Sequence, residues 1–409
     1  ALDKLATGAP LPSSVPGVER PAVRPADRAI DWTSDDAAAV LRKIRSADGV
    51  PGARDRVAGR DALLFDAHPA PELANLGAPG DLIARRGGAV ARVAADGAAV
   101  WIGHMKRRVG PDAPPELKLS AAAMLGDAAA GLPERGEGPP DVRYVEDNGV
   151  GWLDFPFYNG AMGVAECRRL LAAYRQALAR NTRVLVLAGG PDFWSNGVHL
   201  NQIEAADSPA DESRRAINAI NDLAEAVLAT TDRLTVAALS GAAGAGGVFL
   251  ALGADLVWPR LGVVLNPHYK GMGNLYGSEY WTYVLPRRVG RERAEIVTQA
   301  RLPMGAAEAR RLGLADDAFG EDVATHRAEV WRRAQELAAD PAYPALLADK
   351  QARRAADEAA KPLAAYRAEE LARMKLNFYG FDPSYHVARY NFVFKVAKSR
   401  TPYYLATHR

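Results

Sequence analysis

The chain has 409 residues, of which 48% are apolar and 24% are charged. This length exceeds that of one ordinary domain, so two or three units are expected, and the apolar share excludes an intrinsically disordered chain. The 51 basic and 49 acidic side chains nearly cancel, so no nucleic-acid partner is implied. A lone cysteine, Cys167, can form neither an internal disulfide nor a thiolate metal site, which favours a reducing compartment.

Neither a targeting signal nor a membrane span is indicated. The first residues have no apolar core of the kind found in a signal peptide. The uncharged stretch 234–254 is about one bilayer span long. Its many glycines and alanines favour a strand, a glycine turn and a buried helix instead. We therefore expect a cytoplasmic protein without membrane contact. The chain begins with Ala1 rather than Met, which leaves open processing or a missing upstream part.

Residues 1–26 form a proline-rich lead-in, and the following residues predict a small β-rich domain over 27–108. Thr33 or Ser34 is expected to cap its first helix. The short apolar runs that follow are separated by Gly-Gly and Asp-Gly turns, which is typical of a β-meander. The segment 109–141, bounded by prolines and glycines, is expected to be a linker around an alanine-rich patch.

Between residues 142 and 330 the pattern changes to strands that alternate with helices. Two apolar runs, 184–187 and 234–239, predict strands that are buried on both faces. Ser208, followed by a proline and an acidic residue, predicts the start of a long helix. This alternation indicates an α/β unit with parallel strands. Beyond it, 331–409 is expected to be a helical extension with an aromatic tail.

Two glycine-bearing turns, 189–198 and 240–247, each follow a buried strand. The second turn lacks the spacing of a dinucleotide-binding loop, because Phe249 occupies the third glycine position. Free backbone N–H groups at such a turn can stabilise an oxyanion. Glycines that provide clearance for close strand–helix packing are the alternative, and this motif alone does not decide between the two. The seven histidines show no close paired spacing, so no metal site is expected.

Together the two turns resemble the crotonase (enoyl-CoA hydratase/isomerase) superfamily. Trp194-Ser195-Asn196-Gly197-Val198 is similar to the first element of its pattern, and Ala245-Gly246-Gly247 is similar to the second. The resemblance implies a crotonase-like (ClpP/crotonase) α/β fold, which is a spiral of β-β-α units. It also implies that the backbone N–H groups of Val198 and Gly246 form an oxyanion hole for the carbonyl of a coenzyme A (CoA) thioester. The residues expected to contact CoA or substrate are Trp194, Ser195, Asn196, Gly197, Gly247 and Tyr280.

The chain departs from that superfamily at the two positions where its hydratases carry catalytic glutamates. Phe249 and His268 stand there, and a phenylalanine cannot transfer a proton, so different chemistry on an acyl-CoA is expected. The polar and aromatic run 266–281 contains the candidates for that chemistry. They are Glu279 or His268 as base or acid, with Tyr276 as the orienting group. The alternatives are a solvated helix face for Glu279 and a hydrogen-bonded structural role for His268.

The small domain has a resemblance of its own. Ile30-Asp31-Trp32 and the run 44–53 are similar to the C-terminal domain of formyltransferases of the methionyl-tRNA formyltransferase type, which is a small β-barrel. The resemblance implies that the formyltransferase catalytic domain is missing upstream. It also implies that 10-formyltetrahydrofolate acts only through that absent domain.

A formyltransferase tail joined to a crotonase unit resembles a family of hydrogenase maturation factors, HypX (also HoxX). The runs 193–197, 266–281 and 403–409 all look like that family. The resemblance implies a lyase that releases carbon monoxide from formyl-CoA in the crotonase-like domain. This would be the second half of CO synthesis from 10-formyltetrahydrofolate for nickel–iron hydrogenase maturation.

On this view the ligand is a small-molecule acyl-CoA, and hydrogenase maturation proteins are the expected partners. Two alternatives stay open. One is an acyl-CoA hydratase, isomerase or hydrolase whose acid/base residues have moved, and the other is a non-catalytic scaffold that binds CoA or a partner. The sequence does not determine the oligomeric state.

Overall fold

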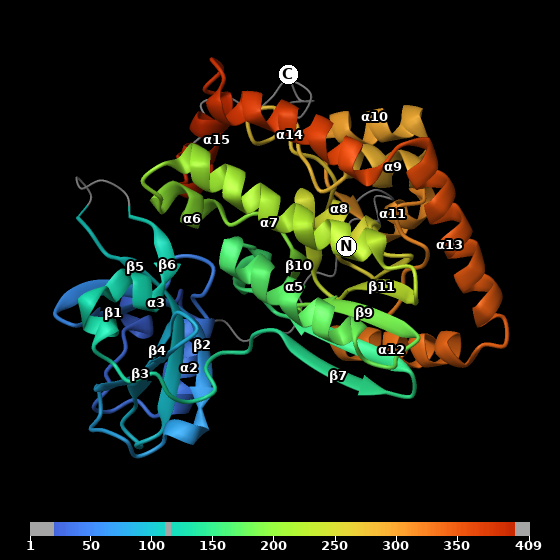
Figure 1. Ribbon diagram of the computed structural model, residues 1–409. Helices are drawn as coiled ribbons and strands as arrows, with labels where there is room; N and C mark the ends of the chain where they lie inside the picture. The colour runs from blue at the N-terminus through green and yellow to red at the C-terminus, as the bar shows by residue number, and fades with distance from the viewer. Residues whose placement is uncertain (1–19, 111–115, 397–409) are drawn as a thin grey trace, which may run out of the picture.

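The computed structural model describes residues 20–110 and 116–396 (Figure 1). Most of the proline-rich lead-in and the end of the aromatic tail, including 403–409, lie outside these residues. Figure 1 shows a small β-rich unit formed by the first part of the chain and a larger unit of strands and helices formed by the rest.

The small unit is built on an antiparallel sheet with the strand order β1-β2-β5-β4-β3. Leu64, Val90 and Ile102 belong to its buried core, together with Val40 and Ile44 of helix α2. Strands β3, β4 and β5 pair with one another in chain order, which confirms the predicted β-meander. The elements are η1 (Pro25–Arg28), α2 (Ala37–Arg45), β1 (Ala53–Val57), β2 (Arg60–Ala70), η2 (Pro71–Leu73), β3 (Leu82–Arg86), β4 (Ala89–Val93) and β5 (Ala99–Arg107).

The first α-helix begins later than the sequence predicted. Asp36, and not Thr33 or Ser34, caps it, since the Asp36 carboxylate accepts the Ala39 N–H at 2.6 Å. The Thr33 hydroxyl instead donates to Asp31 Oδ1 at 2.6 Å, within the turn that precedes the helix. Three neighbouring side chains could each act as the cap, and the turn geometry selects among them.

The described part of the expected linker 109–141 contributes to the small unit. β6 (Lys118–Ser120) pairs with β5 beyond the end of β4. The next helix, α3 (Ala121–Leu125), places Leu125 in the core of the small unit, and α4 (Asp127–Ala130) follows it. The alanine-rich patch is apolar enough to pack, so the flanking prolines and glycines did not by themselves mark a free linker.

The larger unit contains a five-stranded sheet with the order β13-β11-β9-β8-β7. β9 and β11 lie inside it, pair in parallel and are buried along their whole length, which confirms the two apolar strands predicted from the sequence. Of these strands, β7 alone runs antiparallel to its neighbour. The strands are β7 (Arg143–Asp147), β8 (Val150–Phe155), β9 (Val184–Gly189), β11 (Leu234–Leu239) and β13 (Leu256–Pro259).

A second sheet, with the order β10-β12-β14-β15, is formed mainly by short strands that follow the long ones. β9 leads into β10 and then α6 and α7, β11 leads into β12 and α8, and β13 leads into β14 and α9. This repeated strand–strand–helix unit is the crotonase-like spiral that the resemblance implied. The elements are β10 (Phe193–Ser195), α6 (Leu200–Ala205), α7 (Pro209–Ala229), β12 (Ala242–Gly244), α8 (Gly246–Leu252), β14 (Val264–Asn266), α9 (Trp281–Val289) and β15 (Met304–Gly305).

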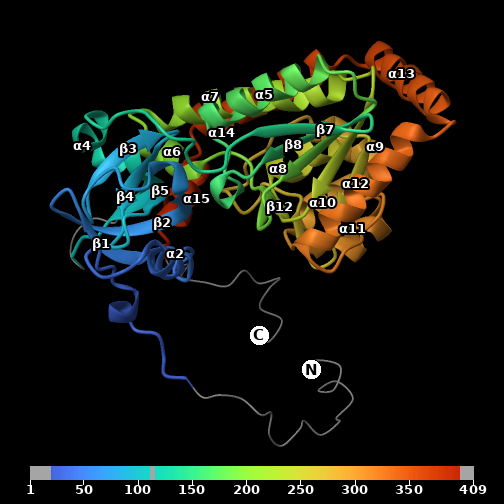
Figure 2. The same cartoon turned by 90° about the horizontal axis from the view of Figure 1, so that it is seen from below.

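Helices cover both faces of the five-stranded sheet (Figure 2). Cys167 of α5 and Leu223 of α7 join the core on one face, whereas Val330 of α12 joins the core on the other. α14 contacts α7 and α9 and buries Met374 in the first core, so the helical extension completes the larger unit. The remaining helices are η3 (Tyr158–Gly160), α5 (Val164–Leu178), α10 (Arg291–Ala300), α11 (Ala306–Leu312), α12 (Val323–Ala339), α13 (Tyr343–Ala360), α14 (Leu363–Tyr379) and α15 (Ser384–Val393).

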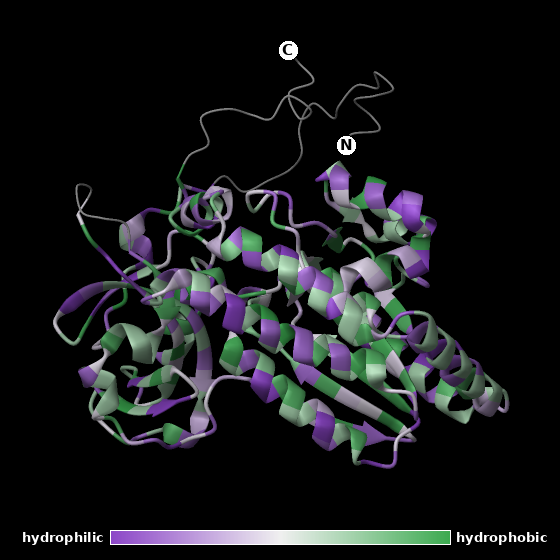
Figure 3. Ribbon diagram, turned by 45° about the horizontal axis from the view of Figure 1, so that its top comes forward, coloured by the Kyte–Doolittle hydropathy of each residue, from purple (hydrophilic) through white to green (hydrophobic). Residues whose placement is uncertain are grey.

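Helix α7 begins as predicted, with Ser208 Oγ accepting the Asp211 N–H at 3.3 Å. Green and purple segments alternate around α7 in Figure 3, because the helix contains both apolar and charged residues. The apolar residues, such as Ile217 and Leu223, are buried, and the charged residues are not. The stretch 234–254 forms β11, β12 and α8, as expected for a strand, a glycine turn and a buried helix. Within residues 20–110 and 116–396, none of the helices has the length and apolar content that crossing a membrane requires.

Candidate active site at the two glycine turns

The two glycine turns meet where the neighbouring strands β10 and β12 of the second sheet end. β10 and β12 pair in parallel, so the turns that follow them end side by side. Gly247 packs so closely on Ser195 that a Cβ at Gly247 would lie 2.6 Å from the Ser195 carbonyl carbon. Gly197 has a φ of +75°, and a Cβ there would lie 3.3 Å from the Gly246 nitrogen. Both glycines are therefore required by close approach, and Gly197 also by its left-handed backbone.

This packing brings the two predicted oxyanion-hole donors to the same place. Val198 directly follows Gly197, and Gly246 opens helix α8 against it. In the part of the chain that the structure describes, neither the Val198 N–H nor the Gly246 N–H donates to another group. Two free N–H groups on adjacent turns can both bind one carbonyl oxygen.

Glu279 lies against Gly246, one of these two donors. A Cβ built on Gly246 would lie 2.5 Å from the Glu279 side-chain carboxyl carbon, so only a glycine leaves room for the carboxylate. Glu279 is 1% exposed. Burial raises the pKa of Glu279 to about 7, a hydrogen bond from Tyr269 opposes the rise, and the nearby Glu370 carboxyl adds to it. The alternative of a solvated helix face is therefore excluded for this residue.

Tyr269, and not Tyr276, is the tyrosine that contacts Glu279. Its hydroxyl donates to Glu279 Oε2, and its ring stacks on Phe249 at 5.2 Å between centroids. Tyr276 is half-buried against Trp281, with ring centroids 5.5 Å apart, and has no hydrogen bond to Glu279. The 266–281 run thus folds Tyr269 back onto the carboxylate, and the orienting role expected of Tyr276 stays a prediction.

His268 is buried on the same run with unpaired polar atoms. Both ring nitrogens lack a hydrogen-bond partner among the described residues, as do Asn266 Oδ1 and Trp281 Nε1. Burial lowers the pKa of His268, which keeps its imidazole neutral. The structure shows no contact between His268 and Glu279. Buried polar atoms are normally paired, so this group of unpaired atoms has the chemistry of a surface that binds a polar ligand.

The other residues expected to contact substrate mainly build the first turn. Trp194 is buried and its indole N–H donates to the Leu187 carbonyl at 3.1 Å. Ser195 Oγ accepts the Gly197 N–H at 3.1 Å, and Asn196 donates to the Asn159 carbonyl at 2.8 Å.

Tyr280 connects the start of α9 to α7. Its ring is fully buried, and its hydroxyl donates to Glu225 on α7 at 2.9 Å. It directly follows Glu279, but the two side chains have different hydrogen-bond partners. The contact with CoA expected of Tyr280 stays a prediction.

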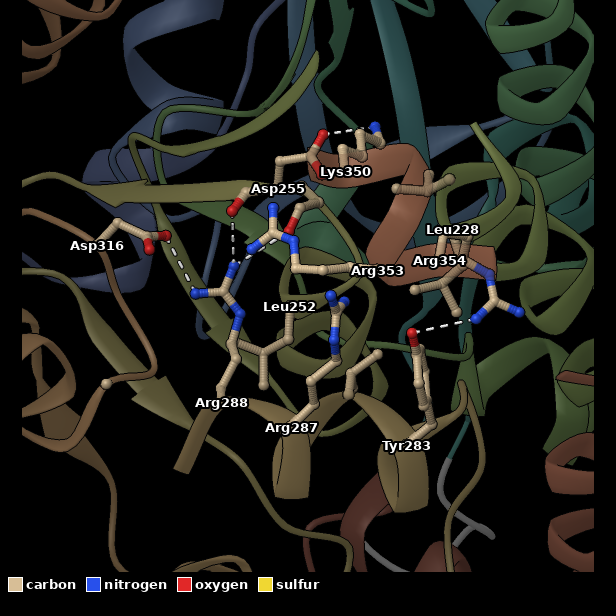
Figure 4. Close-up of a pocket in the computed structure, with 15 residues that line it drawn as sticks. Leu228, Leu252, Asp255, Tyr283, Arg287, Arg288, Asp316, Lys350, Arg353 and Arg354 are labelled. Atoms are coloured by element: carbon tan, nitrogen blue, oxygen red, sulfur yellow. Dashed lines mark hydrogen bonds and ion pairs between the residues drawn. The ribbon is translucent and has the colours of Figure 1, made fainter. Parts of the chain in front are cut away.

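A cavity of about 290 Å³ lies near the start of strand β11, at the other end of the strand from the glycine turn (Figure 4). Asp255 marks that end of the strand, since it accepts the N–H of Thr235 at the start of β11, while the glycine turn follows the end of β11. Arg288 pairs with Asp316 at 3.0 Å, and Lys350 pairs with Asp255 at 2.6 Å. The cavity is thus bordered by salt bridges that join α9 and α13 to the sheet, away from Glu279.

A second hollow, of about 370 Å³, borders the candidate site. Gly271 of the 266–281 run lines it, together with Val387 and Phe392 of α15. A Cβ on Gly271 would lie 3.8 Å from His268 Cε1, so the hollow approaches the buried histidine. Its lining is mostly apolar, in contrast to the salt-bridged cavity near the start of β11.

Comparison with known proteins agrees with both resemblances. Residues 161–375 match the enoyl-CoA hydratase/isomerase family, and residues 22–116 match the formyl transferase C-terminal domain. An enoyl-CoA hydratase structure from Bacillus halodurans aligns with a TM-score of 0.54 over 61% of this chain and 99% of that one. At 18% identity, that likeness shows the fold alone.

Two relatives carry the same combination of domains along nearly the whole chain. The hydrogenase maturation factor HoxX of Bradyrhizobium diazoefficiens is 59% identical over 388 residues, which are 94% of this chain and 67% of that protein. The structure of HypX from Aquifex aeolicus in complex with tetrahydrofolic acid is 43% identical, with a TM-score of 0.93 over 100% of this chain and 73% of that one. With both domains in the same order and this identity, the chain belongs to the HypX/HoxX family of hydrogenase maturation factors.

Proposed function

We propose that this chain releases carbon monoxide from formyl-CoA, as the second half of CO synthesis from 10-formyltetrahydrofolate. The observation that carries the proposal is the position of Glu279. A buried carboxyl with a pKa of about 7 lies directly beside Gly246, whose free N–H, with that of Val198 on the adjacent turn, would bind a thioester carbonyl. An ordinary hydratase needs two such acids in this place, and Phe249 and His268 stand where they would be.

The reaction needs one proton to move from carbon to sulfur. The Val198 and Gly246 N–H groups hold the formyl oxygen and fix the thioester. The ionised Glu279 takes the formyl hydrogen as a proton, and the electron pair of that C–H bond stays on carbon as the lone pair of CO. The C–S bond breaks with its electron pair on sulfur, and a lone pair of the formyl oxygen forms the third carbon–oxygen bond. The proton then passes from Glu279 to the departing thiolate, so formyl-CoA gives CO and CoA with no other reactant.

The surrounding residues support this path. Tyr269 binds Oε2 of Glu279, which leaves Oε1 as the oxygen for the proton. The ring of Phe249 lies between those of Tyr269 and Trp281, and these aromatic groups would exclude water and so suppress hydrolysis of the thioester to formate. His268 and Trp281, whose buried ring nitrogens lack side-chain partners, are the candidates on this run to donate a hydrogen bond to the sulfur as it leaves.

The family comparison supports the placement of this reaction. The Aquifex HypX structure was obtained with tetrahydrofolic acid, the product of formyl transfer from 10-formyltetrahydrofolate. We infer that a formyltransferase part of the protein loads CoA with the formyl group in the cytoplasm, and that CO passes to partners in hydrogenase maturation. A CoA thioester is the only group that this chain's own site would then have to bind.

The proposal is tested by mixing the protein with formyl-CoA and following CO through the absorbance of haemoglobin. We expect CO and free CoA in equal amounts, with a rate that rises as the pH passes upward through about 7, because Glu279 must be ionised to accept the proton. Glu279→Gln is expected to lower the rate by about 10²–10⁴-fold.

Three other outcomes would contradict the proposal. Rapid hydration of crotonyl-CoA would indicate a hydratase, and formate without CO would indicate a hydrolase. Binding of formyl-CoA without turnover would indicate a scaffold. Glu369→Gln serves as the matched control, since Glu369 is exposed and pairs with Lys361.

A further inference from the structure

Glu370 of α14 is a second buried carboxyl group beside the candidate site. It is fully buried, and both of its oxygens are used. Oε2 accepts the Tyr280 N–H at 3.0 Å, and Oε1 accepts both the Thr282 N–H at 2.9 Å and the Thr282 hydroxyl at 2.6 Å. The Ser278 hydroxyl adds a longer bond of 3.3 Å to Oε2. Glu370 therefore binds the residues on both sides of Glu279 without touching its side chain.

The segment that Glu370 binds has an unusual backbone. Glu279 and Tyr280 both have a φ of +58°, in the left-handed region that residues other than glycine rarely adopt. Each such residue costs on the order of 1–3 kcal/mol unless its surroundings hold it. Helix α9 begins directly after this pair, and no side chain of the pair caps it. The first N–H groups of a helix need acceptors from elsewhere, and Glu370 supplies them from α14.

Asn221 of α7 completes the support. Its Oδ1 accepts the Glu279 N–H at 2.9 Å, and its Nδ2 donates to Ser278 Oγ at 2.8 Å. Asn221 is fully buried, as is Ser278. The left-handed turn is thus clamped by two helices, α7 on one side through Asn221 and α14 on the other through Glu370.

We propose that Glu370 is a positioning residue for Glu279, which holds the left-handed turn so that the Glu279 carboxylate faces Gly246. The role rests on the proposed function of Glu279 as the base. Without the Glu370 acceptors, the strained turn relaxes, and the carboxylate leaves the space that the glycine at 246 provides. The residue lies outside the two glycine turns and the 266–281 run, on a helix of the C-terminal extension.

The charge of Glu370 also affects the ionisation of Glu279. The pKa of both carboxyls is raised to about 7, mainly by burial, and the Glu370 charge contributes to the rise at Glu279. Glu370 receives three bonds of 3.0 Å or less, whereas Glu279 receives the Tyr269 hydroxyl. When the two carboxyl groups share one proton, the negative charge is therefore favoured on Glu370 and the proton on Glu279.

The other ionisable groups near this turn are accounted for. The Tyr269 hydroxyl faces Glu279 and is kept neutral, because burial raises its pKa. The thiol of Cys167, on α5, is also neutral for the same reason. On the α7 side, the Tyr280 hydroxyl binds Glu225, which Arg367 of α14 neutralises at 2.8 Å. Glu370 is thus the uncompensated negative charge that acts on Glu279.

Glu370→Gln tests the proposal, because it keeps the size of the side chain, removes the charge and leaves one acceptor oxygen. Infrared spectra of the full chain recorded against pH report the carbonyl band of protonated buried carboxyls, with Glu279→Gln identifying the band of Glu279. Removing a like charge favours ionisation, so we expect the Glu279 band to titrate about one pH unit lower in Glu370→Gln. The kcat for CO release should fall while KM for formyl-CoA changes little.

The outcomes separate this proposal from the function on which it rests. If the wild-type chain releases no CO but the infrared shift occurs, the proposed function fails and the coupling stands. If CO is released and folded Glu370→Gln keeps both the wild-type kcat and the wild-type titration, the positioning role is overturned. Glu369→Gln, the neighbour on α14, should change neither.

A reciprocal measurement covers the case in which Glu370→Gln does not fold. In Glu279→Gln the Glu370 band should titrate at a lower pH than in the wild-type chain, since the coupling acts in both directions. A Glu370 band at an unchanged pH would overturn the coupling. Thr282→Val, which removes only the hydroxyl bonded to Oε1, should leave the Glu279 titration in place and lower kcat modestly.

Discussion

At Glu279, burial and hydrogen bonding act in opposite directions on one carboxyl group. Burial and the charge of Glu370 raise its pKa, and the Tyr269 hydroxyl lowers it. The balance places the pKa at about 7, where a carboxylate is a much stronger base than in water and is still about half ionised at neutral pH. The tyrosine that makes this contact therefore affects both the orientation and the ionisation of the base.

Tyr269→Phe separates these effects at the residue scale. Loss of a hydrogen bond to a charged group is expected to lower the rate of CO release by roughly 10–100-fold. The rate should also rise at a higher pH than in the wild-type chain, because the bond that favoured the ionised carboxylate is gone. Rates measured from pH 5 to pH 9 with formyl-CoA check both expectations.

Tyr276→Phe is the control for that measurement. Tyr276 shares the run and the residue type, but its ring packs on Trp281 and its hydroxyl does not bond Glu279. A smaller loss of rate and an unshifted pH profile are expected. An equal shift in the two variants would mean that the hydrogen bond from Tyr269 to Glu279 does not set the pH profile.

At the scale of elements, the close approach of α8 to the turn after β10 creates the site. The approach needs glycine at 246 for the Glu279 carboxylate and at 247 for the Ser195 carbonyl. The register of β10 and β12 then decides where the two N–H donors lie. A change of a few tenths of an ångström here moves a donor relative to the thioester oxygen.

Gly247→Ala is predicted to test this approach. The added Cβ would overlap the Ser195 carbonyl, which forces α8 away from β10 and costs about 1–3 kcal/mol of unfolding free energy. CO release should fall as well, since the Gly246 donor moves with α8. Urea denaturation and the CO assay measure the two effects.

Gly49→Ala is the matched substitution, because no atom lies within 4 Å of a Cβ at that position. Its unfolding free energy should stay within about 0.5 kcal/mol of the wild-type value, as for a surface substitution. A Gly247→Ala protein as stable and as active as Gly49→Ala would show that α8 need not lie so close.

At the scale of the whole molecule, the small unit docks on the crotonase-like unit through Tyr158. Its hydroxyl donates to Asp48 Oδ1 at 3.0 Å and accepts from Lys118 at 3.0 Å, and its ring stacks on His104 at 4.3 Å. Asp48, His104 and Lys118 all belong to the small unit, while Tyr158 precedes α5. Burial lowers the pKa of Lys118, so the lysine is held at some cost in solvation.

Tyr158→Phe should loosen this joint while keeping the stacked ring. Leaving Asp48 and Lys118 without the hydroxyl is expected to cost about 1–3 kcal/mol. Scanning calorimetry should show the small unit melting earlier and the main transition little changed. Tyr144→Phe, which removes an exposed hydroxyl bonded to Glu146, should not separate the transitions, and a single unchanged transition in Tyr158→Phe would contradict the role of the hydroxyl.

Local patterns in the sequence were enough to locate most of the fold and part of the site. Apolar runs predicted β9 and β11, and the Ser-Pro start predicted α7, since strand burial and helix capping depend on neighbouring residues. The two glycine turns identified Val198 and Gly246, and the departure at Phe249 directed attention to Glu279. The strand and helix inferences use neighbouring residues, whereas Val198 and Gly246 were identified through the resemblance of two turns that lie far apart in the chain.

The tertiary structure alone decided which groups surround Glu279. Tyr269 and Tyr276 are equally polar and lie on the same run, so their order along the chain does not show which one folds back onto the carboxylate. Glu370 and Asn221 lie on helices far from Glu279 in the sequence, and contacts of that kind leave no periodicity to read. The sequence by itself determined the two glycine turns, whereas the packing of α7 and α14 determined where the Glu279 carboxylate points, because a strained backbone persists only when distant groups hold it.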